Sequence, residues 1–351
     1  MKSFTLSIAG ALAVLLVVGL VGCTKTQNPD DKIAKADPSI DSLIAKVAGA
    51  REPMQSRRLL LDPRGTQDPN GLASTVTDIT VDDSIVYAAH QGGLVIYDLN
   101  SDAFRTLSTK QPLHAVVKHD GNIYVGGDRL YELRDTDLVP VSDDLGGIVT
   151  VLYSYGPALM VGTESGLYSK TASGTVQLMR DVWVTAITAD GNGLWVGTDG
   201  DGLYRWDNQN FTQRFLTRDS SLFDYVNSLT YSHGLVYLGT TNGLFVYNGG
   251  RWQPYTTADG LPSDNVMAVA VSGWTAYVAT DQGVVSFNEG DFTPVRHLET
   301  EPSTSLHNSP CGLLVGTETD GLLLKQRDAV KLLVRTTSTG SGDMVLLSNG
   351  D

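Results

Sequence analysis

The feature that most restricts the fold of this chain is a short motif that recurs along most of its length. The motif is an apolar run ending in a small residue and usually Thr, then a polar turn, then Gly-Leu and a second alternating run, as in GLWVGTDGDGLYRWD (193–207). Seven copies are present, and their small residues are Ala89, Gly126, Gly162, Gly197, Gly239, Ala279 and Gly316. Spacings of about 40 residues between short alternating runs are typical of propeller blades, whereas helical repeats need a 3.6-residue periodicity.

Each copy is flanked by two further strand patterns. An alternating run precedes it, as in VTAITADGN (184–192), and an aromatic run follows it, as in RWQPYTT (251–257). The sequence therefore predicts an all-β, seven-bladed β-propeller of four-stranded antiparallel blades over residues 75–336, with strands A to D running from the channel outward. A single sheet exposes two apolar faces, which neighbouring sheets in a closed ring can bury. The Gly or Ala of strand B is expected where adjacent blades approach closely, and the Gly-rich turn where φ is positive.

The first 22 residues have the organisation of a secretory signal peptide. Lys2 precedes an apolar stretch that is short for a membrane span. Leu20-Val21-Gly22-Cys23 resembles the bacterial lipobox, in which the signal is removed before a cysteine that becomes lipidated. We therefore expect a signal peptide at 1–22 and a lipidated Cys23, held at a membrane through more than one acyl chain. Thr24 favours the outer membrane if the cell is Gram-negative, and an uncleaved anchor is the alternative.

The segments that flank the repeats carry no blade motif. Residues 23–74 are predicted to form the lipidated cysteine, a linker and one short helix beginning near Asp37, and residues 337–351 a C-terminal tail. That helix either docks on the propeller or binds a partner. The chain has two cysteines, so lipidation of Cys23 leaves Cys311 unpaired, and we expect Cys311 to be a small core residue.

The chain is acidic, with a formal net charge of −14. An acidic surface repels phosphate backbones, so nucleic acid is not an expected partner. The sequence contains no nucleophile elbow, phosphate loop, paired-cysteine metal motif or His-Glu zinc helix motif. We therefore expect no cofactor and no enzymatic activity.

Two segments carry a family resemblance: DGLPSDNVMAVAV (259–271) with the AYVATDQGVVSFN that follows it, and VTAITADGNGLWVGTDGDGLYRWD (184–207). They are similar to the two-component regulator propeller repeat, and the similarity extends over about 260 residues, closest in blades 4 to 6. The resemblance implies a β-propeller, which in that family is commonly the periplasmic sensor region of a hybrid histidine kinase. Residues after 336 do not resemble a kinase, so the resemblance implies at most a sensor subunit for a separate kinase.

If strand A is innermost, the B–C turns and D–A connections of all blades share one mouth of the ring. Five of the seven B–C turns carry a carboxylate, and the second positions of the A strands are read as a mostly polar ring of Thr77, His114, Thr150, Thr185, Asn227, Met267 and His307. The carboxylates either are ordinary turn residues or attract a basic protein surface or a divalent ion. DGDG (199–202) lacks the ligand spacing of a calcium loop, so no metal site is expected. The candidate ligand-binding residues at the mouth are His90, His114, Glu164, Asp199, Asp201, Asn227, Asp281, His307, Glu318 and Asp320.

The histidines and tryptophans allow more than one interpretation. His90, His114 and His307 come from neighbouring blades in this scheme, where they could bind a transition metal as in a propeller lyase, or each satisfy local hydrogen bonds. The remaining histidines are expected to be solvated, and they are His119, His233 and His297. Trp195, Trp206 and Trp252 are predicted to pack between blades. The alternative for these three is that an exposed one binds sugar. Trp183 and Trp274 lie off the repeat positions and are better candidates for the surface.

Three functions follow from these patterns. The favoured one is a lipid-anchored cell-envelope propeller that acts as a non-catalytic scaffold for a protein or an envelope ligand, because the chain combines a rigid ring, a tether and an acidic rim without catalytic motifs. The alternatives are an extracytoplasmic sensor subunit for a separate two-component kinase and a channel-metal propeller lyase.

Overall fold

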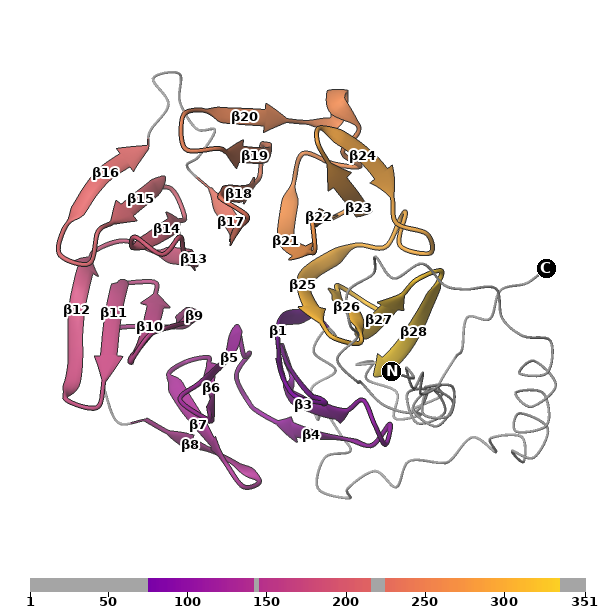
Figure 1. Ribbon diagram of the computed structural model, residues 1–351. Helices are drawn as coiled ribbons and strands as arrows, with labels where there is room; N and C mark the ends of the chain where they lie inside the picture. Colours follow the sequence, from indigo (N-terminus) through magenta and orange to yellow (C-terminus); the bar gives the residue numbers. More distant parts are fainter. Residues whose placement is uncertain (1–74, 142–144, 216–224, 335–351) are drawn as a thin grey trace, which may run out of the picture.

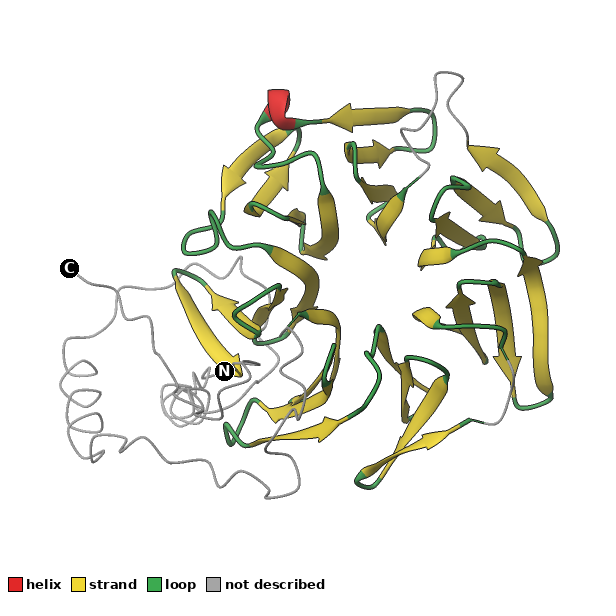
Figure 2. Cartoon of the chain, turned by 180° about the vertical axis from the view of Figure 1, so that it is seen from behind, coloured by secondary structure: helices red, strands yellow, loops and turns green. Residues whose placement is uncertain are grey.

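The computed structural model describes residues 75–141, 145–215 and 225–334, which form seven four-stranded antiparallel sheets arranged in a ring (Figure 1). The prediction of an all-β, seven-bladed propeller is confirmed. The described residues contain a single one-turn 3-10 helix, η1 (Thr257–Asp259), and otherwise only strands and loops (Figure 2). No helix in these ranges has the length and apolarity needed to cross a bilayer. The predicted signal peptide, Cys23, the helix near Asp37 and the C-terminal tail lie outside the described residues.

The four strands of each blade are consecutive in the sequence, with the first innermost. The first four blades comprise β1 (Val76–Asp82), β2 (Ile85–His90), β3 (Gly93–Asp98) and β4 (Phe104–Ser108); β5 (Ala115–His119), β6 (Asn122–Gly126), β7 (Leu130–Arg134) and β8 (Asp137–Pro140); β9 (Val149–Tyr155), β10 (Ala158–Thr163), β11 (Gly166–Thr171) and β12 (Gly174–Arg180); β13 (Val184–Ala189), β14 (Leu194–Thr198), β15 (Leu203–Trp206) and β16 (Phe211–Phe215). The last three comprise β17 (Val226–Ser232), β18 (Leu235–Thr240), β19 (Gly243–Tyr247) and β20 (Trp252–Tyr255); β21 (Val266–Ser272), β22 (Thr275–Thr280), β23 (Gly283–Asn288) and β24 (Asp291–Pro294); β25 (Ser303–Ser309), β26 (Gly312–Thr317), β27 (Leu322–Gln326) and β28 (Ala329–Val334).

The hydrophobic core is divided among the junctions between blades. Each of seven buried clusters joins residues of two adjacent sheets. Between blades 4 and 5, for example, Trp195 and Leu203 pack with Val226 and Leu238. Each sheet thus buries its two apolar faces against its two neighbours, which is why a single repeat cannot fold alone.

The small residue of strand B lies where adjacent blades approach most closely. A Cβ atom added to Gly197 would come within 2.3 Å of Val226 Cγ1 in the next blade, and one added to Gly239 within 2.7 Å of Val266 Cγ1. Gly126, Gly162 and Gly316 meet an equivalent valine of the following blade. The expected role of this glycine is confirmed at these junctions.

Side chains of one blade hydrogen-bond carbonyl groups at or just before the start of the next blade's A strand. The hydroxyl of Thr77 donates to the Leu113 carbonyl at 2.8 Å, and Asn227 Nδ2 donates to the Val266 carbonyl at 3.0 Å. The same bond recurs from Thr150, Thr185 and Thr304 to the next blade. Backbone groups at a strand edge need partners when they are shielded from water. The polar ring at the second positions therefore joins blades, a structural role that competes with ligand binding.

Side chains rather than a shared strand close the ring between blades 7 and 1. Thr304 bonds the Val76 carbonyl, and Lys331 Nζ lies 2.6 Å from Asp102 Oδ1. Val76 and Val86 of blade 1 pack with Leu314 and Leu333 of blade 7 in the cluster at this junction. This closure joins residues more than 220 positions apart in the sequence.

The expectation for Cys311 is wrong. Cys311 lies in the turn between β25 and β26, where it is partly exposed rather than in the core. The turn position explains the difference, because connecting turns run over the surface of a fold. The other cysteine of the chain, Cys23, lies outside the described residues.

Candidate binding surface at the propeller mouth

The B–C turns at the mouth are held by the residue that ends strand B. In blade 5 the fully buried Thr240 hydroxyl donates to the Gly243 carbonyl at 3.0 Å and accepts from the Asn242 N–H at 3.0 Å. Thr163, Thr198, Thr280 and Thr317 make the same pair of bonds. His90 occupies this position in blade 1, is buried, and accepts from the Gly92 N–H through Nδ1 at 3.0 Å. His90 therefore stabilises its own B–C turn. Of the two interpretations of His90, a metal ligand or a residue that makes local hydrogen bonds, the second is the one observed.

The proposed cluster of three imidazoles does not form. His307 is the fifth residue of β25, and Thr304 occupies the second position that was assigned to His307. His307 hydrogen-bonds the Ile79 backbone, and burial lowers its pKa. The described residues contain no group of three or more His, Cys, Asp or Glu side chains arranged to hold a metal ion. The register error arose because blade 7 has Ser303 where most blades have valine at the start of strand A.

His114 lies immediately before β5, at the mouth. Burial lowers its pKa, and the neighbouring Glu164 charge, from the next blade, raises it by a smaller amount. His114 and Glu164 are therefore two predicted site residues that the structure brings close together. Among the other predicted histidines, His119 is buried beside Ser154 rather than solvated, because the ends of the β5 and β9 strands converge there, whereas His233 and His297 are exposed.

Both faces of the ring carry acidic turns, but for different reasons. On the face opposite the mouth, Asp83, Asp120, Asp135 and Glu289 have positive φ, a conformation that Asp and Asn tolerate better than most residues. At the mouth, the carboxylates that follow the turn-holding Thr do not have positive φ, and they are Glu164, Asp199, Asp281 and Glu318. Tolerance of a positive φ, which accounts for the acidic turns of the opposite face, therefore does not account for these four carboxylates.

Two predicted residues on blades 5 and 6 are joined through a third. Asn227 Nδ2 lies 3.3 Å from Asn265 Oδ1, and Asn265 Nδ2 donates to Asp281 Oδ2 at 3.2 Å. The sequence interpretation did not include Asn265, which precedes β21. Because Asn227 also bonds the Val266 carbonyl, its first role is to join blades 5 and 6.

The most exposed aromatic residues at the mouth flank Asp199. Trp183 is 41% exposed and Tyr225 is 49% exposed, and each immediately precedes the first residue of an A strand in adjacent blades. The Asp199 N–H donates to the Trp183 carbonyl at 2.9 Å, and Asp199 forms a backbone bridge with Tyr225. Tyr225 was missed from the sequence, although alignment of the A strands would have shown two aromatic residues at equivalent positions.

A second acidic group lies on blade 7, where Glu318 and Asp320 occupy the B–C turn and Glu301 the connection before β25. Burial and the Asp320 charge raise the pKa of Glu301. Glu301 Oε1 is a buried oxygen without a hydrogen-bond partner among the described residues. A positively charged group near Glu301 would offset both the repulsion from Asp320 and the desolvation cost of the ionised Glu301 carboxylate.

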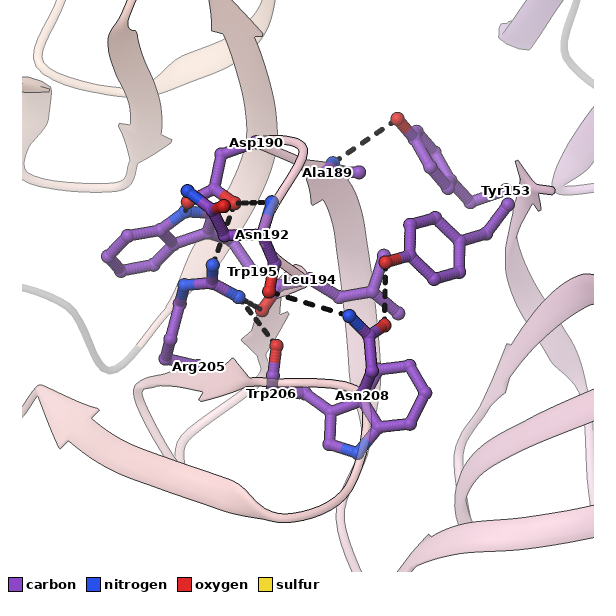
Figure 3. Close-up of polar contacts among 10 residues, drawn as sticks. Tyr153, Ala189, Asp190, Asn192, Leu194, Trp195, Arg205, Trp206 and Asn208 are labelled. Carbon is purple, nitrogen blue, oxygen red and sulfur yellow. Dashed lines mark hydrogen bonds and ion pairs between the residues drawn. The ribbon is translucent and has the colours of Figure 1, made fainter.

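The opposite face of blade 4 is occupied by a structural network (Figure 3). Arg205 Nη2 lies 2.7 Å from Asp190 Oδ1, and the guanidinium carbon is 5.3 Å from the Trp195 ring centre. Asp190 also accepts from Trp195 Nε1 at 2.9 Å. Trp195 and Trp252 pack edge to face across blades 4 and 5, and Trp206 packs against Tyr155 across blades 3 and 4, which confirms the predicted inter-blade role of these tryptophans.

Comparison with solved structures supports the propeller fold. The chain is similar to the extracellular domain of BT4673, a candidate one component system of B. thetaiotaomicron, with a TM-score of 0.60 and 20% identity over 74% of this chain and 39% of that chain. It is also similar to the WD40 β-propeller domain of Doa1, with a TM-score of 0.56 and 17% identity over 74% of this chain and 94% of that domain. The designed protein Ika8 gives a TM-score of 0.51 and 14% identity over 74% of this chain and 98% of that chain. No protein-family model and no curated protein sequence matches the chain.

Proposed function

We propose that this protein is a lipid-anchored propeller of the cell envelope that binds a basic segment of a partner protein at its mouth. The observation that carries the proposal is the group of Trp183, Asp199 and Tyr225, in which the backbone of an acidic residue pairs with the backbones of two exposed aromatic residues. Aromatic faces and carboxylates both attract Arg and Lys side chains. Interfaces commonly derive most of their affinity from a few such aromatic residues.

The acidic turns extend this surface to other blades. Glu164, Glu318 and Asp320 carry negative charge around the same mouth, and an extended field of one sign accelerates association with an oppositely charged partner. The similar propellers in the comparison include the extracellular domain of a one component system and a WD40 domain, which is compatible with a role in binding rather than catalysis. We expect no nucleic-acid partner, because the chain is acidic.

The first prediction concerns crosslinking at the mouth. A photo-crosslinking residue placed at Thr241, an exposed residue of the blade 5 B–C turn, is expected to give discrete protein adducts in the intact envelope. The combined Trp183→Ala, Asp199→Asn and Tyr225→Ala changes should reduce their yield by about tenfold, since interface hot spots are aromatic. Raising the ionic strength should also weaken the adducts, because exposed charges are screened by salt.

The control position is Ala172, which is exposed in the C–D turn of blade 3 on the opposite face. Equal yields of the same adducts from Ala172 and Thr241 would argue against a binding site at the mouth. Adducts from Thr241 that persist in the triple variant would show that the aromatic and acidic group is not the contact.

The second prediction concerns the anchor. If Cys23 is lipidated, cells fed an alkyne fatty acid should label the wild-type protein, and Cys23→Ser should abolish both the label and membrane association. A thioether to lipid and a disulfide to Cys311 both require the Cys23 sulfur, so the two are mutually exclusive. Mass spectrometry of unreduced protein distinguishes them, and a peptide pair joined through Cys23 and Cys311 would rule out the lipid anchor.

The likeness to the extracellular domain of BT4673 favours one second candidate. In that role the protein is an extracytoplasmic sensor subunit that transmits binding at its mouth to a separate kinase. The Thr241 adducts decide between the two, because a sensor subunit should crosslink to the periplasmic part of a kinase.

A further inference from the structure

A groove of about 760 Å³ runs between blades 5 and 6, on the face opposite the mouth. Four hairpin turns surround its opening: the A–B turns with His233 and Trp274, and the C–D turns with Arg251 and Glu289. Pockets that bind small molecules commonly have volumes of about 300–1,000 Å³. The groove is therefore large enough for one or two sugar-sized rings, and it is separate from the proposed protein-binding surface.

Trp274 forms a fixed aromatic platform at this opening. It is 79% exposed, and its ring lies 4.1 Å from the His233 ring of the adjacent blade, with an angle of 33° between the planes. The Asn288 amide, in the orientation that its neighbours favour, donates to the Trp274 carbonyl at 3.1 Å and to Thr275 Oγ1 at 3.2 Å. These contacts hold the turn and leave one face of a large apolar ring in water.

The interior of the groove continues the aromatic surface. The Tyr255 ring packs edge to face on Phe287, with ring centres 4.8 Å apart, and its hydroxyl points toward Gly290 at the rim. The neighbouring Tyr237 also lines the groove, and its phenol, like that of Tyr255, is a hydrogen-bond donor and acceptor at neutral pH. Two phenols thus contribute polar atoms beside the apolar side chains of Leu235, Val246 and Phe287.

The polar residues of the rim carry both signs of charge. Arg251 and Gln253 supply hydrogen-bond donors, whereas Asp291 supplies acceptors. Asp291 and Glu289 would repel an anionic ligand, and Arg251 offsets part of the attraction that these two carboxylates exert on a cationic one. A purely apolar ligand would leave these groups without hydrogen bonds.

We propose that the groove between blades 5 and 6 binds a neutral saccharide. One apolar C–H face of a sugar ring stacks on Trp274, and the ring hydroxyls bond Arg251, Gln253 and Asp291. A sugar is the class of ligand that joins an apolar face to a ring of donors and acceptors without net charge, which matches the aromatic platform and mixed-sign rim.

The test is a titration of the full chain with glucose, galactose, mannose, N-acetylglucosamine, maltose and cellobiose. Binding is followed by saturation-transfer NMR, which detects weak ligands. At least one sugar should bind saturably, and Trp274→Ala should weaken it by about tenfold. Because Trp274 is exposed, the variant should fold, as far-UV circular dichroism can verify. Trp183→Ala, which removes the exposed tryptophan of the mouth, is the matched control and should not change sugar affinity.

Several results would overturn this assignment. One is that none of the six sugars binds saturably. Another is that binding is unchanged in both Trp274→Ala and the Arg251→Ala, Asp291→Ala double variant. A third is saturable binding of choline or of inorganic phosphate in place of the sugars, which would mean that the groove selects charge. Crosslinking at Thr241 reports on the opposite face of the ring. A negative sugar titration would therefore not contradict protein binding at the mouth, and a negative crosslinking result would not contradict sugar binding in the groove.

Discussion

Replacing Gly197 by Ala is expected to lower the free energy of unfolding by about 1–3 kcal/mol, and replacement by Val is expected to lower it further. The added Cβ would meet Val226 Cγ1 at 2.3 Å and Cβ at 2.8 Å, across the junction of blades 4 and 5. Val226 is buried between two sheets, so neither strand can move without disturbing its own ladder. Chemical denaturation monitored by circular dichroism measures the effect.

A double variant tests whether this contact is the cause. Where strand B has Ala279 instead of glycine, the next blade begins with the smaller Ser303 in place of valine. The Gly197→Ala, Val226→Ser double variant should therefore lose less stability than the sum of its two single variants, by about 0.5–3 kcal/mol. Gly250→Ala is the matched control because a Cβ there meets only Asn248 Oδ1, at 3.6 Å, and it should change stability by less than about 0.5 kcal/mol. Strict additivity would refute the steric explanation.

Replacing Asp78 by Ser is expected to stabilise the protein increasingly as pH rises. Asp78 is the third residue of β1, where its carboxylate accepts from the Val116 N–H of the next blade at 2.8 Å. Burial raises its pKa to about 7, although hydrogen bonds from Val116 and Ile79 partly offset this. Ser228 is the equivalent residue of blade 5 and accepts from the Val269 N–H at 3.1 Å, so serine can keep the contact without the charge.

The direction of this pH dependence follows from the number of protons that the folded and unfolded chains bind. Between about pH 4 and pH 7 the folded chain holds a proton on Asp78 that the unfolded chain releases, so the contribution of Asp78 to stability falls as pH rises through this window. The stability of Asp78→Ser relative to wild type should therefore increase by about 2–4 kcal/mol across the window and then level off. Comparing the two proteins at each pH cancels the titration of His307, whose pKa burial lowers.

Asp98 provides a control of opposite sign. Hydrogen bonds from Ser101 and Asn100 lower its pKa, so Asp98 adds stability that is lost as pH falls. Asp98→Asn should thus destabilise the protein at neutral pH and less so in acid. If the unfolding free energies of wild type and Asp78→Ser stay parallel from pH 4 to 7, Asp78 does not have the raised pKa that its burial implies.

Much of the candidate site could be placed from the sequence, but its contacts could not. The position of the B–C turns at one mouth follows from strand order, so Glu164, Asp199 and Glu318 were assigned to the correct face. The role of His90 could not be predicted, because Thr occupies the equivalent position in most other blades. Only the hydrogen bond from the Gly92 N–H shows that the His90 side chain holds the turn as threonine does elsewhere. His307 was placed in the wrong register because blade 7 lacks the valine that marks the start of strand A.

The sequence by itself determined the all-β class, the number of blades and the role of the strand B glycines. Strand alternation and turn chemistry are local properties, and they recur in each repeat of about 40 residues. Only the tertiary structure decided which side chains join blades, how Trp183 and Tyr225 come to flank Asp199, and where a groove opens beside Trp274. Those features depend on contacts between separate sheets, and a local pattern does not specify the distance or orientation between residues that are tens to hundreds of positions apart.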